Sequence, residues 1–358
     1  MTQPGSPLER FALASWLVLV MTMLLTMARI PMVSWDARAI WGHHARLIHD
    51  AGRWPAPEVW DLGYPLPHNQ YPPLLPLLQA AAYGLVPDER VLRVVPFLAY
   101  PVIVGLLLLE LPRRDPRRGR LLASSYALLP TLVLSEQGGA DAGVADTVLA
   151  GWVLGAALAL DAGRPALGGA LAAAAGLTKN EGLVLGALLV FSAGLRCGQR
   201  RRSLRPLLSA GGAFLAGVLP WLALRARIRP GLDENYLSRL NAEQLASGLE
   251  RAPAVAVEMA RIAFLNPSRT GLFFWLVLLL FASSRRRRES WIERRLLVLP
   301  AYLAVVFVVY VISPWPGLTQ VQLSFERLLL PVAPLALLAL AEPSALTPPV
   351  DPRVPARP

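Results

Sequence analysis

The residues best suited to chemistry gather in the polar segment Ser34–Pro73, between the first apolar run of the chain and the next. A connecting loop needs no such groups, whereas carboxylates and imidazoles can move protons or bind cations. The segment therefore predicts a functional site directly after the first apolar run. Its carboxylates and histidines, which include every histidine of the chain, are Asp36, Asp50, Glu58, Asp61, His43, His44, His49 and His68.

Three further signals follow this segment. Asp141 and Asp146 place two carboxylates at the mouth of a helix, and charge beside a transmembrane segment is costly and is kept mainly for function. Lys179 is the only lysine of the chain and lies between two half-length apolar runs. There its ammonium could meet a phosphate as a point charge. Arg327 begins the last apolar run and places a guanidinium at its outer end.

The elements that carry these residues are predicted to be transmembrane helices. Hydrophobic residues make up 54% of the chain and charged residues 16%. An apolar stretch of about 20 residues can cross the hydrocarbon core as a helix, and Phe11–Val33 is the clearest case. It is too long for a removable signal peptide and has no small-residue cleavage site. Val94–Leu111 and Leu296–Ile312 are apolar on all sides, which argues against a soluble helical bundle.

The net charge of +11 comes from arginine clusters in short loops between apolar runs, within 113–120, 196–205 and 285–295. Basic loops of this kind mark the cytoplasmic side of a membrane protein. The charge therefore indicates topology, and no nucleic-acid partner is expected. The single cysteine, Cys197, excludes a disulfide within the chain.

Placing every arginine cluster inside predicts an all-α, polytopic transmembrane bundle of about ten spans over residues 1–341. The segment Leu74–Val86 is short for a span and is expected to be interfacial or re-entrant. If it crossed the membrane, the first arginine cluster would lie outside, against the positive-inside rule. External loops 34–73 and 225–268 then lie on one face, and the Pro-rich segment 342–358 is predicted to be a disordered cytoplasmic tail. The expected spans are 11–33, 91–111, 119–135, 145–161, 165–178, 182–196, 207–224, 270–283, 296–313 and 328–341.

The order of the polar motifs is more specific than any one of them. An Asp in the first external loop is followed by Tyr71-Pro-Pro-Leu, a Gly-x-Ala-Asp helix start, the turn Leu177-Thr-Lys-Asn-Glu-Gly and an Arg at the last helix. In this order and topology, residues 11–341 resemble the GT-C superfamily of polytopic glycosyltransferases. Within it the chain is similar to bacterial family 39 members, related to protein O-mannosyltransferases and to lipid A aminoarabinose transferase.

Such enzymes take a sugar from a polyprenyl-phosphate carrier and pass it to a lipid, polysaccharide or protein. The resemblance implies an inverting transfer with Asp36 as the general base for the acceptor hydroxyl. The leaving phosphate needs fixed cations, for which Lys179 and Arg327 are the candidates, with Arg38 in reserve. It also implies an active site on the external face of the plasma (inner) membrane, with acceptor recognition by the two external loops.

The second carboxylate of the family corresponds to Asp146, or less directly to Asp141. Either could position the acceptor or bind a divalent ion, which some members of the superfamily use and others do not. Tyr71, Pro72 and Pro73 are expected to shape the return of the loop to the membrane.

Each of these residues has an alternative role. Asp36 and Asp146 could each cap a helix N-terminus. Lys179 could snorkel to lipid headgroups, and Arg327 could anchor a helix end to lipid phosphates.

The whole chain also has alternatives. A transporter or flippase for a lipid-linked sugar should show internal repeats and helices broken at mid-membrane, and no convincing repeat is present. A non-catalytic subunit of a glycosyltransferase complex is the third hypothesis. His43 and His44 could ligate a metal, although neighbouring residues on a helix point about 100° apart.

Overall fold

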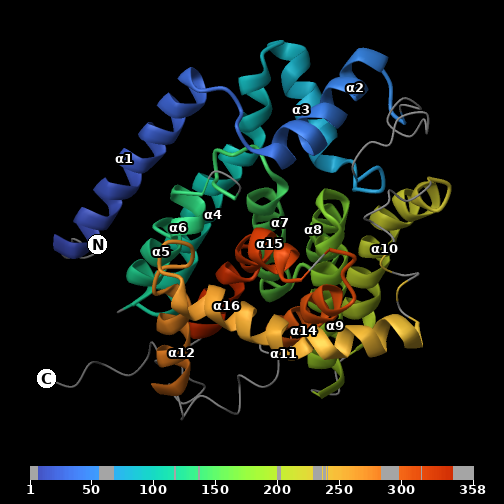
Figure 1. Ribbon diagram of the computed structural model, residues 1–358. Helices are drawn as coiled ribbons and strands as arrows, with labels where there is room; N and C mark the ends of the chain where they lie inside the picture. The colour runs from blue at the N-terminus through green and yellow to red at the C-terminus, as the bar shows by residue number, and fades with distance from the viewer. Residues whose placement is uncertain are drawn as a thin grey trace, which may run out of the picture.

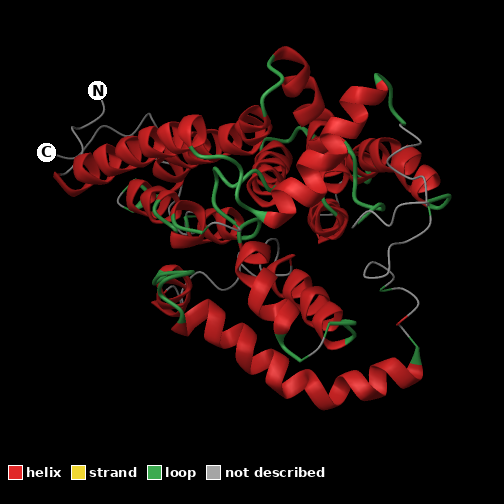
Figure 2. Ribbon diagram, turned by 45° about the horizontal axis from the view of Figure 1, so that its top comes forward, coloured by secondary structure: helices red, strands yellow, loops and turns green. Residues whose placement is uncertain are grey.

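The computed structural model describes residues 7–55, 68–116, 118–135, 138–199, 203–228, 236, 239, 241–283, 298–315 and 317–341. Over these ranges helices are the regular elements, and no strand is present (Figure 2). Glu58, Asp61, the arginines of 285–295 and the predicted tail 342–358 lie outside the described residues. The all-α expectation is confirmed.

Most of the helices coincide with the expected spans (Figure 1). Proline marks several helix ends because it lacks the N–H that a helix interior needs. Arginine stands at other helix ends. In chain order they are α1 Pro7–Arg29, α2 His43–Ala51, α3 Leu74–Leu85, α4 Val94–Arg114, α5 Gly119–Ala127, α6 Pro130–Val133, α7 Ala145–Asp161, α8 Pro165–Thr178, α9 Asn180–Gln199, α10 Arg205–Arg225, α11 Ala242–Leu265, α12 Phe273–Ser283, α14 Val298–Val311, α15 Thr319–Leu329 and α16 Ala333–Leu340. Two short turns, the π-helical η1 (Ala37–Gly42) and the 3₁₀-helical η3 (Glu89–Arg93), precede α2 and α4.

Three expected elements differ from the observed ones. The expected span 119–135 is divided into α5 and α6, because Pro130 cannot continue the hydrogen-bond ladder of α5. The last span begins earlier, at α15, and bends by 44° into α16. The segment 225–268 is not a plain loop, since the 24-residue helix α11 occupies most of it.

Within the described residues, three helices are long and apolar enough to cross a membrane by themselves: Glu9–Arg29, Glu89–Arg114 and Arg205–Arg225. A fourth span is obtained if the bent pair α15 and α16 counts as one. Helices α3, α8, α14 and the segment Asn180–Gly194 of α9 are apolar but shorter. The helical membrane fold is thus confirmed with three to four such spans, and the count of about ten stays a prediction.

Helices α7, α9 and α10 pack against α8, whose buried residues are mainly glycine and alanine. A Cβ on Gly169 of α8 would lie 2.1 Å from the carbonyl oxygen of Ala210 on α10. A Cβ on Gly182 of α9 would lie 1.9 Å from the carbonyl oxygen of Ala175 on α8. Only glycine permits these backbones to approach so closely. The close packing fixes the turn between α8 and α9, where Lys179 lies.

Ion pairs tie helix ends together at one end of the bundle. Arg114 at the end of α4 contacts Asp161 at the end of α7 at 3.0 Å. Arg120 of α5 contacts Glu9 of α1, also at 3.0 Å. The arginine-based topology places all four residues on the cytoplasmic side. The start of α7 and the turn after α8 therefore lie at the opposite end.

Candidate functional site

Arg327 and Asp36 form an ion pair between the last and the first polar segments of the chain. Nη1 of Arg327, on α15, donates to Oδ2 of Asp36 at 2.5 Å. Both side chains are largely buried, with 11% and 25% of their surfaces exposed. Gly138 makes room for the aliphatic part of the arginine, because a Cβ there would lie 2.8 Å from Cγ of Arg327.

Asp146 and Lys179 form a second, more deeply buried pair. Asp146 lies in the first turn of α7, and Lys179 ends α8 in an extended conformation. Nζ of Lys179 donates to Oδ1 of Asp146 at 2.8 Å and lies 3.5 Å from Oε1 of Glu181. Burial by itself disfavours the ammonium, but the Asp146 and Glu181 carboxylates outweigh it and raise the pKa of Lys179. The lysine is therefore charged at neutral pH.

The two ion pairs form one cluster. The Arg327 guanidinium interacts electrostatically with Asp146 and with Lys179 as well as with Asp36. Two carboxylates and two cations, drawn from four segments of the chain, thus meet at the end of the bundle opposite Arg114 and Asp161. The structure brings together four residues that the sequence analysis selected independently.

The geometry also bears on their alternative roles. Asp36 makes no capping hydrogen bond to the following turn. The backbone N–H of Ala37 instead donates to Oγ of Ser34, at 3.4 Å. Lys179 is buried and directed to Asp146, a geometry that is incompatible with snorkelling to headgroups. Asp146 likewise uses its carboxylate on the lysine.

Asp141 takes part in a different contact from Asp146. Its carboxylate pairs with Nη2 of Arg93 at 3.2 Å, and its carbonyl oxygen accepts from Nε of the same arginine at 2.5 Å. Nη1 of Arg93 donates to the carbonyl oxygen of Ile30 at 2.8 Å. Arg93 therefore ties the turn before α7 to the end of α1. This arrangement gives Asp141 a positioning contact at the edge of the cluster.

Tyr71 lies beside the cluster and joins it to the first loop. Its ring stacks on His68 at 4.5 Å between centroids and lies 5.2 Å from the ring of Trp41. It also interacts electrostatically with the Arg327 guanidinium. Tyr71 thus lies closer to the ion-pair cluster than its expected loop-shaping role implied.

The remaining candidates occupy the surroundings of the cluster. Pro72 and Pro73 are buried, and Pro73 directly precedes α3 at its N-cap position, which agrees with a role in shaping the loop. Arg38 is exposed on η1 and enters none of the ion pairs seen within the described ranges. It therefore stays a reserve.

The histidines give little support to a metal site. In the part of the chain that the structure describes, no three His, Cys, Asp or Glu side chains come together in a way that could hold a metal ion. Burial, and secondarily Arg46, lower the pKa of His43 from its ordinary value. His43 is thus a neutral, partly buried residue of α2 at pH 7.

Sequence reasoning missed two contributors to the site. Glu181, two residues after Lys179, interacts with the same ammonium. Arg225, at the end of α10, donates to Oδ1 of Asn180 at 3.1 Å and contacts Gln70 at 3.4 Å. The Lys-Asn-Glu motif carried a signal for Glu181, whereas nothing local distinguishes Arg225 from the other arginines.

Comparisons with known proteins place this geometry in a known fold. No protein-family model and no curated protein matches the chain. The crystal structure of ArnT from Cupriavidus metallidurans bound to undecaprenyl phosphate matches 92% of this chain, with a TM-score of 0.57 and 21% sequence identity. The chain has the ArnT fold. The apo structure of the same protein matches equally broadly, with a TM-score of 0.55 and 19% identity.

The likeness to ArnT is one of fold, because the sequence identity is low. The resemblance to GT-C glycosyltransferases is thereby confirmed at the level of architecture. This chain covers 59% of the length of the ArnT chain in both comparisons. The matched part contains the bundle and spans nearly all of the present chain.

Proposed function

We propose that this chain is a multi-pass membrane glycosyltransferase that moves a sugar from a polyprenyl-phosphate carrier to a cell-envelope acceptor. The observation that carries the proposal is the convergence of Asp36, Arg327, Asp146 and Lys179 from four segments. The ArnT fold supports it, because the solved ArnT complex contains undecaprenyl phosphate. The proposed active site faces the exterior of the plasma (inner) membrane.

The two cations are the proposed site for the carrier phosphate. Lys179 supplies a compact ammonium and Arg327 a planar guanidinium, and both can donate charge-assisted hydrogen bonds to phosphate oxygens. Each is held by a carboxylate, so its position is set before the lipid binds. Charges fixed in a buried site stabilise a developing negative charge more strongly than they would in water.

Asp36 is the proposed general base. Its carboxylate takes the proton of the acceptor hydroxyl while the hydroxyl oxygen bonds to the anomeric carbon. The bond from that carbon to the phosphate oxygen breaks, and polyprenyl phosphate leaves with the electron pair. Attack opposite the leaving group inverts the anomeric configuration. Arg327 contacts Asp36, so one guanidinium would orient the base and meet the leaving phosphate.

Asp146 has a supporting part in this proposal. It faces Lys179 and Arg327, so it balances two positive charges and keeps them in place without carrier. Asp146, or less directly Asp141, is the carboxylate that a divalent ion would use, although no three metal-ligating side chains come together within the described residues. Substrate positioning by Asp146 needs no metal.

The test is transfer by the purified full chain in nanodiscs. A panel of polyprenyl-phosphate hexoses and pentoses is supplied with envelope extract as acceptor, and released polyprenyl phosphate is measured. We expect one donor to be consumed and Asp36→Asn to slow the reaction by about 10²–10⁴-fold. The variant keeps the shape and the Arg327 contact, so it should fold and bind carrier.

Two outcomes would contradict the proposal. Movement of intact donor between leaflets of proteoliposomes, with no donor cleaved in the panel, would favour the flippase hypothesis. Turnover by Asp36→Asn at the wild-type rate would remove Asp36 from catalysis.

A further inference from the structure

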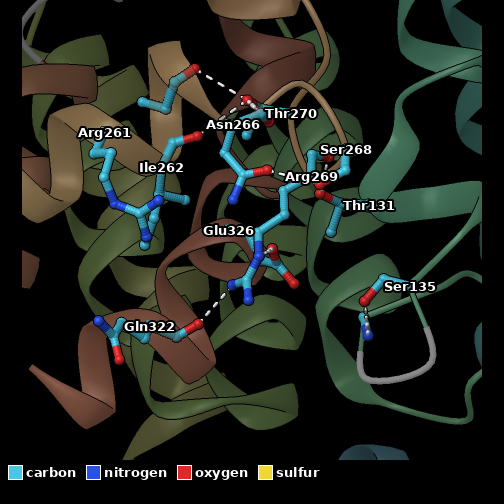
Figure 3. A network of polar contacts seen from close by, with 12 residues as sticks. Thr131, Ser135, Arg261, Ile262, Asn266, Ser268, Arg269, Thr270, Gln322 and Glu326 are labelled. Atoms are coloured by element: carbon cyan, nitrogen blue, oxygen red, sulfur yellow. Dashed lines mark hydrogen bonds and ion pairs between the residues drawn. The ribbon is translucent and has the colours of Figure 1, made fainter.

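The residue before Arg327 belongs to a separate polar network. Glu326 is buried, with 7% of its side chain exposed, and its Oε2 lies 3.1 Å from Nε of Arg269 (Figure 3). Successive residues of a helix point about 100° apart. Helix α15 therefore directs Glu326 toward Arg269 and Arg327 toward Asp36. The orientation of one side chain about the helix axis determines that of the other.

Arg269 is itself fixed to two neighbouring elements. Its Nη1 donates to the carbonyl oxygen of Gln322, one turn before Glu326 on α15, at 2.6 Å. Its own carbonyl oxygen accepts a hydrogen bond from Oγ1 of Thr131, on α6, at 2.5 Å. The turn after α11 thus connects α6 to α15, as Figure 3 shows.

The same network also reaches Arg327 through Ser135 and Gly138. Oγ of Ser135, which follows α6, accepts from the backbone N–H of Gly138 at 3.0 Å, and the Ser135 side chain also interacts with the Glu326 carboxylate. Gly138 lies against the aliphatic part of Arg327, at the distance that leaves no room for a Cβ. A closed ring of contacts therefore runs from Glu326 through Ser135 and Gly138 to Arg327.

We propose that Glu326 and Arg269 are positioning residues that hold the Arg327 guanidinium in the orientation needed to bind a carrier phosphate. This inference rests on the proposed function, because it assigns Arg327 to the phosphate. Glu326 touches neither carrier nor sugar in it. Its effect on binding passes entirely through Arg327.

A double-mutant cycle on carrier binding tests this dependence. The probe is undecaprenyl phosphate, titrated against the full chain in nanodiscs. Arg327→Met should weaken binding by roughly 10- to 150-fold, the range of a lost charge-assisted hydrogen bond. Glu326→Gln keeps the shape and removes the charge, and should weaken binding by about tenfold, within the range of couplings between residues in one network.

The decisive measurement is the double variant of Glu326→Gln with Arg327→Met. We expect it to bind no more weakly than Arg327→Met alone, because Glu326 has nothing left to position. Asp161→Asn is the matched control: it breaks a partly buried interhelix ion pair at the opposite end of the bundle, and carrier binding should not change.

If Glu326→Gln fails to fold, the cycle is run with Arg269→Met, which breaks the pair from its more exposed side. Arg269→Lys should recover part of that loss. An equal loss from Glu326→Gln in both backgrounds would overturn the positioning role, since it would show a general effect on the fold. Unchanged binding in Arg327→Met would instead reject the proposed phosphate site itself.

Discussion

The buried pair of Lys179 and Asp146 allows stability and carrier binding to be separated. Their charged atoms lie 2.8 Å apart, and only 8% and 2% of the side chains are exposed. Lys179→Met leaves the Asp146 carboxylate buried without its main partner, which typically costs about 3–5 kcal/mol. Arg327 also faces Asp146, so we expect a loss near the lower end, about 3 kcal/mol.

The double variant Lys179→Met with Asp146→Leu should behave differently. Replacing a whole buried ion pair by well-packed hydrophobic residues of similar size is often nearly neutral for stability. The double variant should therefore be more stable than Lys179→Met. It should still bind carrier poorly, because the ammonium is missing from both variants. A loss of roughly 10- to 150-fold corresponds to one charge-assisted hydrogen bond.

Two assays on the full chain check this. Apparent melting temperature is followed by size-exclusion chromatography in detergent, and undecaprenyl phosphate binding is measured in nanodiscs. A double variant as unstable as Lys179→Met would show that the two residues do not stabilise each other. Wild-type affinity in both variants would remove Lys179 from the phosphate site.

Three further results are expected. Lys179→Arg should recover only part of carrier affinity in the nanodisc titration, because a planar guanidinium does not reproduce a compact ammonium; full recovery would argue for a non-specific positive charge. Gly138→Ala places a Cβ 2.8 Å from Cγ of Arg327, so carrier binding should weaken several-fold, and an unchanged dissociation constant would contradict the described contact. Burial and Arg46 lower the pKa of His43 from 6.5, so unfolding takes up a proton there and stability falls as pH drops below about 6.5. His43→Gln should reduce the difference in melting temperature between pH 7.5 and 5.5, and an undiminished difference would assign that sensitivity to other groups.

The sequence alone identified most helices and the end of the bundle at which the candidate residues gather. Apolar runs and the prolines and arginines that interrupt them mark helix ends locally, so 145–161 and 165–178 were predicted to the residue. Helix α11 was missed because its polar residues keep its hydropathy low, so it lacks the run of apolar residues on all sides that indicates a span. Whether a short apolar run crosses the membrane is likewise a property of its neighbours.

The candidate residues could also be recognised in the sequence. A lone lysine, or a carboxylate beside an apolar run, is costly in a membrane protein, and this cost makes such residues visible in the sequence. Asp36, Asp146, Lys179 and Arg327 all carried that signal. Their types, and the prediction that they share one side of the membrane, followed from composition and topology without knowledge of any contact.

Only the tertiary structure decided how the charges are paired. Asp141 and Asp146 are five residues apart and were both candidates for the second carboxylate, yet Asp146 meets Lys179 whereas Asp141 meets Arg93. The direction of a side chain at a helix start depends on where the turn ends, and its partner depends on which helices pack beside it. No local pattern could link Glu326 to Arg269 either. That contact exists only after α11 and α15 pack together.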